Sequence, residues 1–452
     1  MKHPSLPHLL QVALFGGAIA TTTTLSFLSP VLSPAVNAAL EDSPKALLDE
    51  AWQIVNREYV DTTFNRVDWQ QVRQELLGRE YTSREEAYTA LRESLERLED
   101  PYTRFLDPRQ YRALTSQTSG ELSGIGIRLR LDDNTQSLTV VEPIQNSPAM
   151  VAGVQAGDRI LAIDGKPTQG MTVDEASELI RGEIGTRITL RIDRTGTGAF
   201  DLPLTRERIQ LRTVNYALKR EGNVQVGYIR LAEFSGHASE QMQQAIEELT
   251  KQGAEAFVLD LRGNPGGLLQ ASIDISRMWM EQGAIVRTVD RAGNSKETTA
   301  NHTALTNLPL AVLVNGNSAS SSEILTGALM DNQRATIVGS RTFGKALVQS
   351  VHALSDGSGL AVTIAHYYTP GGTDISHRGI TPHVQIDLTD QQRQQLTSNP
   401  NLLATPSDPQ YAGAVDSLRQ SVLANRTLPS QNQQVSERSP ETTMDANRRA
   451  YQ

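Results

Sequence analysis

The stretch "LAVLVNGNSASSSEILTGALMDNQRATIVGS", residues 310–340, joins two short apolar runs through a segment with helical spacing. The runs "LAVLVN" and "ATIVGS" have the length of buried strands, whereas "SSSEILTGALMDN" between them has the length and spacing of a helix. The same alternation continues outward through "VGYIRLAEF" (226–234), "ASEQMQQAIEELTKQG" (238–253) and "AFVLDL" (256–261). Short apolar strands that alternate with helices predict an α/β core, which we place at residues 206–390.

The segments on either side of this core have different patterns. Apolar residues at three- and four-residue spacing predict helices over 43–99, within an N-terminal helical region at 39–112. Residues 113–205 contain β-like runs such as "RITLRIDR" and one helical pattern, "TVDEASELIRG". Residues 391–452 form a Gln-, Ser- and Asn-rich tail that we expect to lack assigned structure. The fold class expected is therefore α/β in an α+β multidomain chain.

Composition excludes several kinds of function. The chain has 452 residues and a formal net charge of −9 with no basic run, so it is not expected to bind nucleic acid. Because it contains no cysteine, it has neither a disulfide nor a thiol nucleophile. No Cys/His or clustered Asp spacing suggests a metal site, and we expect no metal and no cofactor.

The first 38 residues have the order of a secretory signal. Lys2 provides a charged start, an apolar run extends from Leu9 to Ala20, and small residues precede Ala39. The threonines at 21–24 interrupt the apolar run well short of the roughly 20 residues that a bilayer needs. We therefore expect export with cleavage after Ala38, with retention as an anchor as the alternative.

Four serines stand within five positions of the central stretch: Ser318, Ser320, Ser321 and Ser322. Ser320 precedes Glu323 by three residues, just ahead of the run "ILTGALM", which is the pattern of a capping box. A helix N-terminus also favours negative charge that develops on an oxygen. One hydroxyl could therefore be a cap, a nucleophile or both, and the local sequence leaves these interpretations open.

A serine nucleophile needs a base, and the usual base is histidine. None of the eight histidines lies in a recognisable triad arrangement, which leaves Lys345 in "RTFGKALVQS" as the candidate. A lysine acts as a base only when neutral, and burial near apolar neighbours such as Phe343 would lower its pKa. Gln349 shares a face with Lys345 in a helix or a strand, so its neutral amide could orient the amine. The alternative is an ordinary solvated surface lysine.

Two elements within 113–205 together resemble a PDZ domain. The first is "GIGI", Gly124, Ile125, Gly126 and Ile127, which we expect to open an apolar strand with backbone N–H groups free for a carboxylate. The second is "SPAMVAGVQAGDRILAIDGKP", residues 147–167. In such a domain a peptide C-terminus adds as a strand beside the first element, so the resemblance implies a free protein C-terminus as ligand.

The motifs "LDLRGNPGG", "SASSSEILTGALMDNQRA" and "GSRTFGKALVQS" together resemble the carboxyl-terminal processing proteases, or tail-specific proteases, which form subfamily A of peptidase family S41. The resemblance covers about residues 44–388 and implies a crotonase-like α/β serine protease core. By position in the motifs, Ser320 would be the nucleophile, Lys345 the general base and Gln349 its orienting partner. The backbone N–H groups of Gly266 and Ser321 would form the oxyanion hole.

Two positions depart from the pattern of that family. Ser321 stands where the family usually has alanine, which leaves the backbone donor in place. Ala346 stands where the family usually has glycine, which adds a methyl group beside the lysine. Asp331 falls where the family often has a carboxylate, but a helix-end or ion-pair role near Arg334 is the favoured interpretation.

The resemblance implies a serine endopeptidase that cleaves exported proteins near their C-terminus, with the PDZ domain recognising the free end. The segments "REYVDTTFNRVDWQQVRQELLGREY" and "DPYTRFLDP" are similar to the cyanobacterial and chloroplast branch of the family. The known substrate class of that branch is the photosystem II D1 precursor, trimmed in the thylakoid lumen. General tail-specific proteolysis in a periplasm or lumen and a non-catalytic PDZ scaffold remain alternatives. The partners expected are C-terminal segments of substrate proteins, with peripheral membrane association left open.

Overall fold

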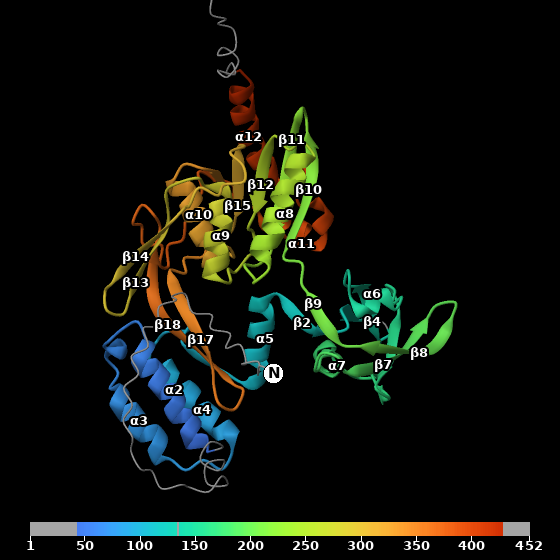
Figure 1. Ribbon diagram of the computed structural model, residues 1–452, viewed down its shortest axis with the longest axis vertical. Helices are drawn as coiled ribbons and strands as arrows, with labels where there is room; N and C mark the ends of the chain where they lie inside the picture. The colour runs from blue at the N-terminus through green and yellow to red at the C-terminus, as the bar shows by residue number, and fades with distance from the viewer. Residues whose placement is uncertain (1–42, 133–134, 428–452) are drawn as a thin grey trace, which may run out of the picture.

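The computed structural model describes residues 43–132 and 135–427 (Figure 1). The expected signal at 1–38 and the last part of the tail, 428–452, lie outside these residues. The fold class is confirmed: helices and sheets are mixed, and a helical region, a small β-rich unit and an α/β core follow one another along the chain. In the described part of the chain, no helix is both long and apolar enough to cross a bilayer.

The N-terminal region is built from three helices, α2 (Pro44–Glu58), α3 (Trp69–Gly78) and α4 (Arg84–Glu96). Asp68 caps α3 through the Gln71 N–H at 3.0 Å, and Ser83 caps α4 in the same way. The apolar faces of the helices pack against Leu360 and Val362 in a strand of the core.

The helical region continues into the core through β1 (Arg104–Leu106), which pairs antiparallel with β18 (Gly359–Tyr368). Helix α5 (Pro108–Ser119) follows and spans the domain boundary predicted after residue 112.

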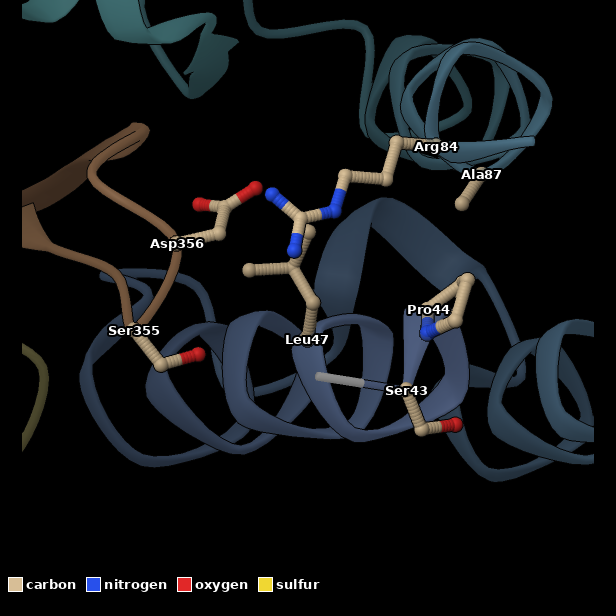
Figure 2. A pocket seen from close by; sticks show the side chains of 7 residues that line it. All are labelled: Ser43, Pro44, Leu47, Arg84, Ala87, Ser355 and Asp356. Carbon is tan, nitrogen blue, oxygen red and sulfur yellow. The ribbon is translucent and has the colours of Figure 1, made fainter. Parts of the chain in front are cut away.

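A cavity of only about 10 Å³ lies where α2, α4 and the turn between β17 (Leu347–Ala353) and β18 meet (Figure 2). It is lined by Ser43, Pro44, Leu47, Arg84, Ala87, Ser355 and Asp356. A cavity of this size has room for about one water molecule. We therefore regard this corner as a packing contact between the helical region and the core.

The small β-rich unit contains a sheet of order β3-β4-β5-β7-β8, with β6 paired to β5. Its elements are β3 (Ile127–Leu131), β4 (Leu138–Pro143), α6 (Pro148–Val151), β5 (Arg159–Ile163), β6 (Lys166–Pro167), α7 (Val173–Ile180), β7 (Arg187–Arg194) and β8 (Gly198–Thr205). A two-stranded ribbon of β2 (Glu121–Gly124) and β9 (Glu207–Gln210) connects this unit to the core.

The expectation that "GIGI" opens one strand is wrong. Gly124 ends β2 and Ile127 begins β3, with Ile125 and Gly126 between the two strands. Gly126 has φ +75°, and a Cβ there would lie 2.3 Å from the Cβ of Ser147, so only glycine can make this turn. The chain therefore bends at the glycine instead of running on as a strand.

The core sheet has the order β10-β11-β12-β15-β16-β19, with β10 antiparallel and the other neighbours parallel. Its elements are β10 (Val214–Glu221), β11 (Val224–Leu231), β12 (Ala256–Asp260), β15 (Leu310–Val314), β16 (Thr336–Gly339) and β19 (Val384–Gln385), with helices α8 (Ala238–Lys251), α9 (Leu269–Trp279) and α10 (Ser321–Asp331). A second sheet contains β1, β17 and β18 together with β13 (Ala284–Asp290) and β14 (Ser295–Thr299).

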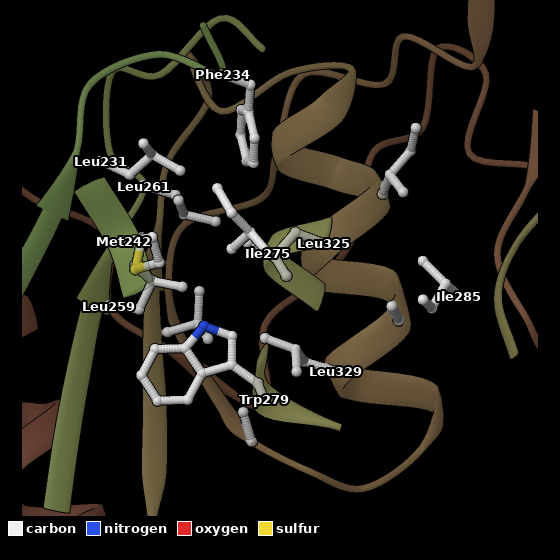
Figure 3. Close-up of a cluster of buried hydrophobic side chains, with 14 of the residues drawn as sticks. Leu231, Phe234, Met242, Leu259, Leu261, Ile275, Trp279, Ile285, Leu325 and Leu329 are labelled. Carbon is white, nitrogen blue, oxygen red and sulfur yellow. The ribbon is translucent and has the colours of Figure 1, made fainter. Parts of the chain in front are cut away.

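Helix α10 lies deep in the core. Nine successive residues, 321–329, are buried, and Leu325 and Leu329 face Ile275 and Trp279 of α9 (Figure 3). Full burial of a leucine stabilises a fold by about 1.5–3 kcal/mol relative to leaving it exposed. The N-terminus of α10, where Ser320 lies, is therefore fixed by a rigid support.

The expectation of an unstructured tail is wrong for residues 391–427. Helices α11 (Asp390–Ser398) and α12 (Pro409–Thr427) follow the core, with η2 (Pro400–Leu402) between them. Because side chains alternate along a strand, Ala311 and Leu313 of β15 face away from α8, α9 and α10 and pack against α12. Residues of α12 at helical spacing complete this second cluster: Tyr411, Ala414, Val415, Leu418 and Val422. Because the segment as a whole is polar, this helical spacing of its few apolar residues was missed in the sequence.

Candidate active site

Ser320 is the N-cap of α10 and has a strained backbone, with φ 53° and ψ −115°. Its carbonyl oxygen accepts from the N–H of Glu323 at 2.7 Å and from the N–H of Ile324 at 2.9 Å. Its own N–H donates to the Glu323 carboxylate at 3.0 Å. Ser320 and Glu323 thus form the capping box that their spacing predicts, but the Glu323 N–H is taken by the Ser320 carbonyl oxygen, and among the described residues the Ser320 hydroxyl has no cap bond of hydrogen-bond geometry. Backbone atoms and the Glu323 side chain therefore form this cap, and the hydroxyl is left available.

The other three serines of the cluster have hydroxyls committed to backbone carbonyls. Ser318 donates to the carbonyl of Leu261 at 2.8 Å. Ser321 donates to Gly267 at 3.0 Å, and Ser322 donates to Asn264 at 2.9 Å. These bonds fasten the start of α10 to the 261–267 loop. Ser320 is therefore the member of the cluster whose hydroxyl is not used for structure.

Glu323 connects the start of α10 to the loop that carries Lys345. Its fully buried carboxylate accepts hydrogen bonds from the Thr342 hydroxyl at 2.6 Å, the Gly344 N–H at 2.7 Å and the Lys345 N–H at 2.9 Å. Burial raises the pKa of this carboxyl, while the hydrogen bonds act in the opposite direction. The sequence indicated Glu323 only as a capping partner, because its contacts with the loop are made across 19 to 22 residues.

Lys345 lies just before β17, mostly buried, and its Nζ is 4.2 Å from the centre of the Tyr102 ring. Burial is the main cause that lowers the pKa of its amine from 10.5 to about 8, and the nearby Arg104 lowers it further. Asp100 and Glu323 act in the opposite direction. The alternative of a solvated surface lysine is therefore wrong. Phe343 is 53% exposed, so the ring that covers the amine is that of Tyr102.

Gln349 lies on β17, and its amide is bonded to a residue other than Lys345. Its Nε2 donates to the Thr363 hydroxyl at 3.5 Å, and a β-bulge between Val348 and Gln349 breaks the alternation expected of a regular strand. Among the described residues, no hydrogen bond joins Lys345 Nζ to Ser320 or to Gln349. The backbones of Ser320 and Lys345 are bridged instead by the buried Tyr367. Its hydroxyl donates to the Ser320 carbonyl oxygen at 3.2 Å and also contacts the Lys345 carbonyl oxygen.

Gly266 lies directly against Ser320, as the motif implies. With φ +110°, a Cβ at this position would be 2.9 Å from the Ser320 Cβ and 3.1 Å from the Ser321 nitrogen. The Gly266 N–H, however, donates to the Asn264 Oδ1 at 2.9 Å. In the described chain the Ser321 N–H, at the start of α10, has no such partner. Of the two expected oxyanion donors, the Ser321 N–H is therefore free among the described residues, and the Gly266 N–H is bonded to Asn264. Asn264 was not identified from the sequence.

A buried ion-pair network supports the same loop from the side of α12. Arg262 donates to Asp260 at 2.7 and 2.9 Å and to Asp408 at 2.8 and 2.9 Å. Both carboxylates are fully buried, and the two anions raise the pKa of the guanidinium despite the opposing effect of burial. The position of the loop that contains Gly266 therefore depends on a residue of the segment predicted to be unstructured.

Asp331 ends α10, in agreement with the helix-end interpretation, and its carboxylate accepts from the Gly371 N–H at 2.8 Å. The ion-pair part of that interpretation is wrong, because Arg334 donates to the backbone carbonyls of Trp279 and Leu308. Ala346 is buried, and its carbonyl accepts from the Tyr367 N–H at 3.0 Å.

The turn at Ile125 and Gly126 presents backbone groups beside the edge strand β3. The Ile125 carbonyl accepts from Ala149, and the Gly126 carbonyl accepts from Ile144. Among the residues that the structure describes, the N–H groups of Ile125 and Gly126 donate to no protein acceptor. These donors are the kind of group that could hold a carboxylate. Residues 43–132 and 135–427 contain no group of His, Asp and Glu that could hold a metal ion.

Comparison with known proteins gives matches for both the α/β core and the small β-rich unit. The model of peptidase family S41 matches residues 225–386, and that of the PDZ domain matches residues 139–194. A carboxyl-terminal-processing protease of Synechocystis sp. is 46% identical over 383 residues, covering 84% of this chain and 88% of that protein. A chloroplastic C-terminal processing peptidase of Tetradesmus obliquus is 38% identical, covering 78% and 79%. The solved photosystem II D1 C-terminal processing protease is 37% identical with a TM-score of 0.51, covering 82% of this chain and 99% of that one.

Fold and matches together define a peptidase of family S41 that carries a PDZ domain. The chain belongs to the carboxyl-terminal-processing proteases, and it is accordingly a C-terminal processing peptidase.

Proposed function

We propose that the chain is a serine endopeptidase that uses Ser320 as nucleophile and Lys345 as general base on the C-terminal tails of exported proteins. The observation that carries this proposal is the arrangement around Glu323. Its carboxylate holds the backbone of Ser320 and the backbone of Lys345 at once, while the Ser320 hydroxyl makes no cap hydrogen bond. A mostly buried amine with a pKa of about 8 is also suited to accept a proton near neutral pH.

In this mechanism the neutral Lys345 amine takes the proton of Ser320 as Oγ attacks the scissile carbonyl carbon. The resulting oxyanion receives the Ser321 N–H and the favourable field of the α10 N-terminus. The Lys345 ammonium then protonates the departing amine, and water hydrolyses the acyl-enzyme with the same lysine as base. Catalytic hydrogen bonds are often longer in the free enzyme. Substrate binding would bring Ser320 and Lys345 within reach, Gln349 would orient the amine, and Gly266 would exchange its Asn264 bond for the oxyanion.

We assign recognition of the substrate to residues 113–205 and cleavage to residues 206–390. A substrate tail would add as a strand at the free edge of β3, with its carboxylate on the N–H groups of Gly124–Ile127. The unused donors of Ile125 and Gly126 and the edge position of β3 support this assignment.

We further propose the photosystem II D1 precursor as the physiological substrate, because the name of one similar solved structure specifies D1 processing. Export through residues 1–38 into a periplasm or thylakoid lumen would place the enzyme beside such a tail. General tail proteolysis is the competing role. Cleavage of a D1-type C-terminal peptide should exceed that of an unrelated apolar-tailed peptide, and equal rates would favour the general role.

Recognition and catalysis are tested together by measuring cleavage of one peptide, with a free and with an amidated C-terminus, by the full chain and by its Ser320→Ala variant. Amidation removes the charge at the tail and should lower kcat/KM roughly ten- to a hundredfold, because a charge-assisted hydrogen bond contributes about 1.5–3 kcal/mol. Ser320→Ala should abolish cleavage of both forms while the protein still binds the acid form. Cleavage by Ser320→Ala would refute the nucleophile, and equal rates for both termini would refute recognition of the carboxylate.

A further inference from the structure

The segment Asp100–Arg104, which joins the helical region to the start of β1, reaches the proposed catalytic lysine. Asp100 holds the turn by accepting the Tyr102 N–H at 3.0 Å and the Thr103 hydroxyl at 2.7 Å. The Thr103 oxygen in turn accepts the N–H of Thr363 in β18 at 3.0 Å. The segment is therefore fixed at both ends, and the Tyr102 ring lies against Lys345 Nζ at 4.2 Å.

The segment is a turn that leads into β1, and its residues face two sides. A cavity of about 530 Å³ between the segment and α4 is lined by Asp100, Pro101, Thr103, Arg104 and Phe105, whereas Tyr102 does not line it and contacts the Lys345 amine. The segment thus forms a wall between an open cavity and the amine. Tyr102 is the residue of this wall whose ring contacts the amine.

We propose that Tyr102 is a positioning residue for catalysis, which holds the Lys345 amine in place and keeps it dehydrated. This inference rests on the proposed role of Lys345 as the base. Hydration of an ammonium ion is worth several kcal/mol, whereas a cation–π contact is worth about 0.5–2 kcal/mol. Removal of the ring should therefore favour the protonated amine, because the hydration that the ammonium regains outweighs its attraction to the ring.

The charges that face the amine come from several elements. Arg104, on the same segment as Tyr102, acts against the protonated form, and Asp100 acts in its favour. Glu323 of α10 also favours the protonated form. The remaining titratable groups at the site are the hydroxyls of Tyr102 and Tyr367, both with raised pKa values because of burial. Removing the positive charge of Arg104 should consequently act in the same direction as removing the Tyr102 ring.

The experiment is the pH dependence of kcat/KM for a tail peptide with the full chain and its variants. Tyr102→Ala should move the acid limb upward by about one pH unit, which is a tenfold loss at pH 7 that is regained at high pH. Tyr102→Phe keeps the ring and should restore the position of the limb. Arg104 is exposed, so Arg104→Gln should fold normally and move the limb in the same direction. Arg92→Gln, at the far wall of the cavity, is the matched control and should leave the limb in place.

Two results would overturn the inference. The first is an acid limb that stays in place in Tyr102→Ala when that variant is folded. If Tyr102→Ala does not fold, an unmoved limb in Arg104→Gln is the second. If Lys345 is not the general base, the result is different, because Lys345→Ala would then still cleave the peptide. A dead Lys345→Ala together with an unmoved limb would refute only the role of Tyr102.

Discussion

Replacement of Lys345 by methionine should abolish cleavage and yet stabilise the protein. The folded state lowers the pKa of this amine from 10.5 to about 8. At about 1.4 kcal/mol per pKa unit, the folded chain carries a cost of about 3 kcal/mol when the lysine is protonated. Methionine has a similar length, packs well against an aromatic ring and carries no charge. It should therefore remove this cost at pH 7.

The pH dependence of the gain is what identifies its cause. Below pH 8 the lysine is protonated in both the folded and the unfolded state, so the folded state carries the full cost. Between pH 8 and 10.5 only the unfolded chain still holds the proton, and the cost shrinks steadily to zero. The gain in free energy of unfolding from Lys345→Met should thus be about 3 kcal/mol larger at pH 7 than at pH 10.5.

The assay is urea unfolding of the full chain, followed by the fluorescence of the buried Trp279, at several pH values. Lys251→Met is a matched control, because Lys251 is exposed at the end of α8 and should give no pH-dependent gain. A Lys345→Met protein that is no more stable than the parent at pH 7 would refute the reasoning. A gain that stays constant up to pH 10.5 would do the same.

Four further outcomes are expected. Ser318→Ala should lose about 1 kcal/mol of stability in urea unfolding, through the bond to Leu261, and should retain peptide cleavage. Glu323→Gln should lower kcat/KM at least tenfold, because its amide presents a donor to a site that contains only donors, and wild-type rates would contradict this. Asp408→Ala should destabilise the fold by about 3 kcal/mol in the same unfolding assay, since it leaves the Arg262 charge half-paired. Cleavage should be insensitive to EDTA, and inhibition that added metal reverses would exclude the serine mechanism.

The sequence by itself determined the elements whose signals are local. Alternation of apolar strands and helices predicted the α/β core, and the three-residue spacing from Ser320 to Glu323 predicted where α10 begins. The absence of a triad histidine, together with the motif "GSRTFGKALVQS", indicated Lys345 as the candidate base. These signals were readable because helix spacing, caps and strand runs depend on residues only a few positions apart.

The tertiary structure decided which groups are available and which are occupied. It showed that the hydroxyls of three serines are bonded to the 261–267 loop, that the Gly266 N–H is held by Asn264, and that α12 packs against one face of the core sheet. Apart from the local bond of Gly266 to Asn264, these facts depend on contacts between residues more than fifty positions apart, and the Arg262–Asp408 pair that supports the same loop spans 146 positions. The lowered pKa of Lys345 has the same origin, because burial in the folded chain and the charge of Arg104, which lies 241 positions earlier in the sequence, lower it. A one-dimensional pattern cannot encode such contacts, since hydration is lost only when the separate segments come together.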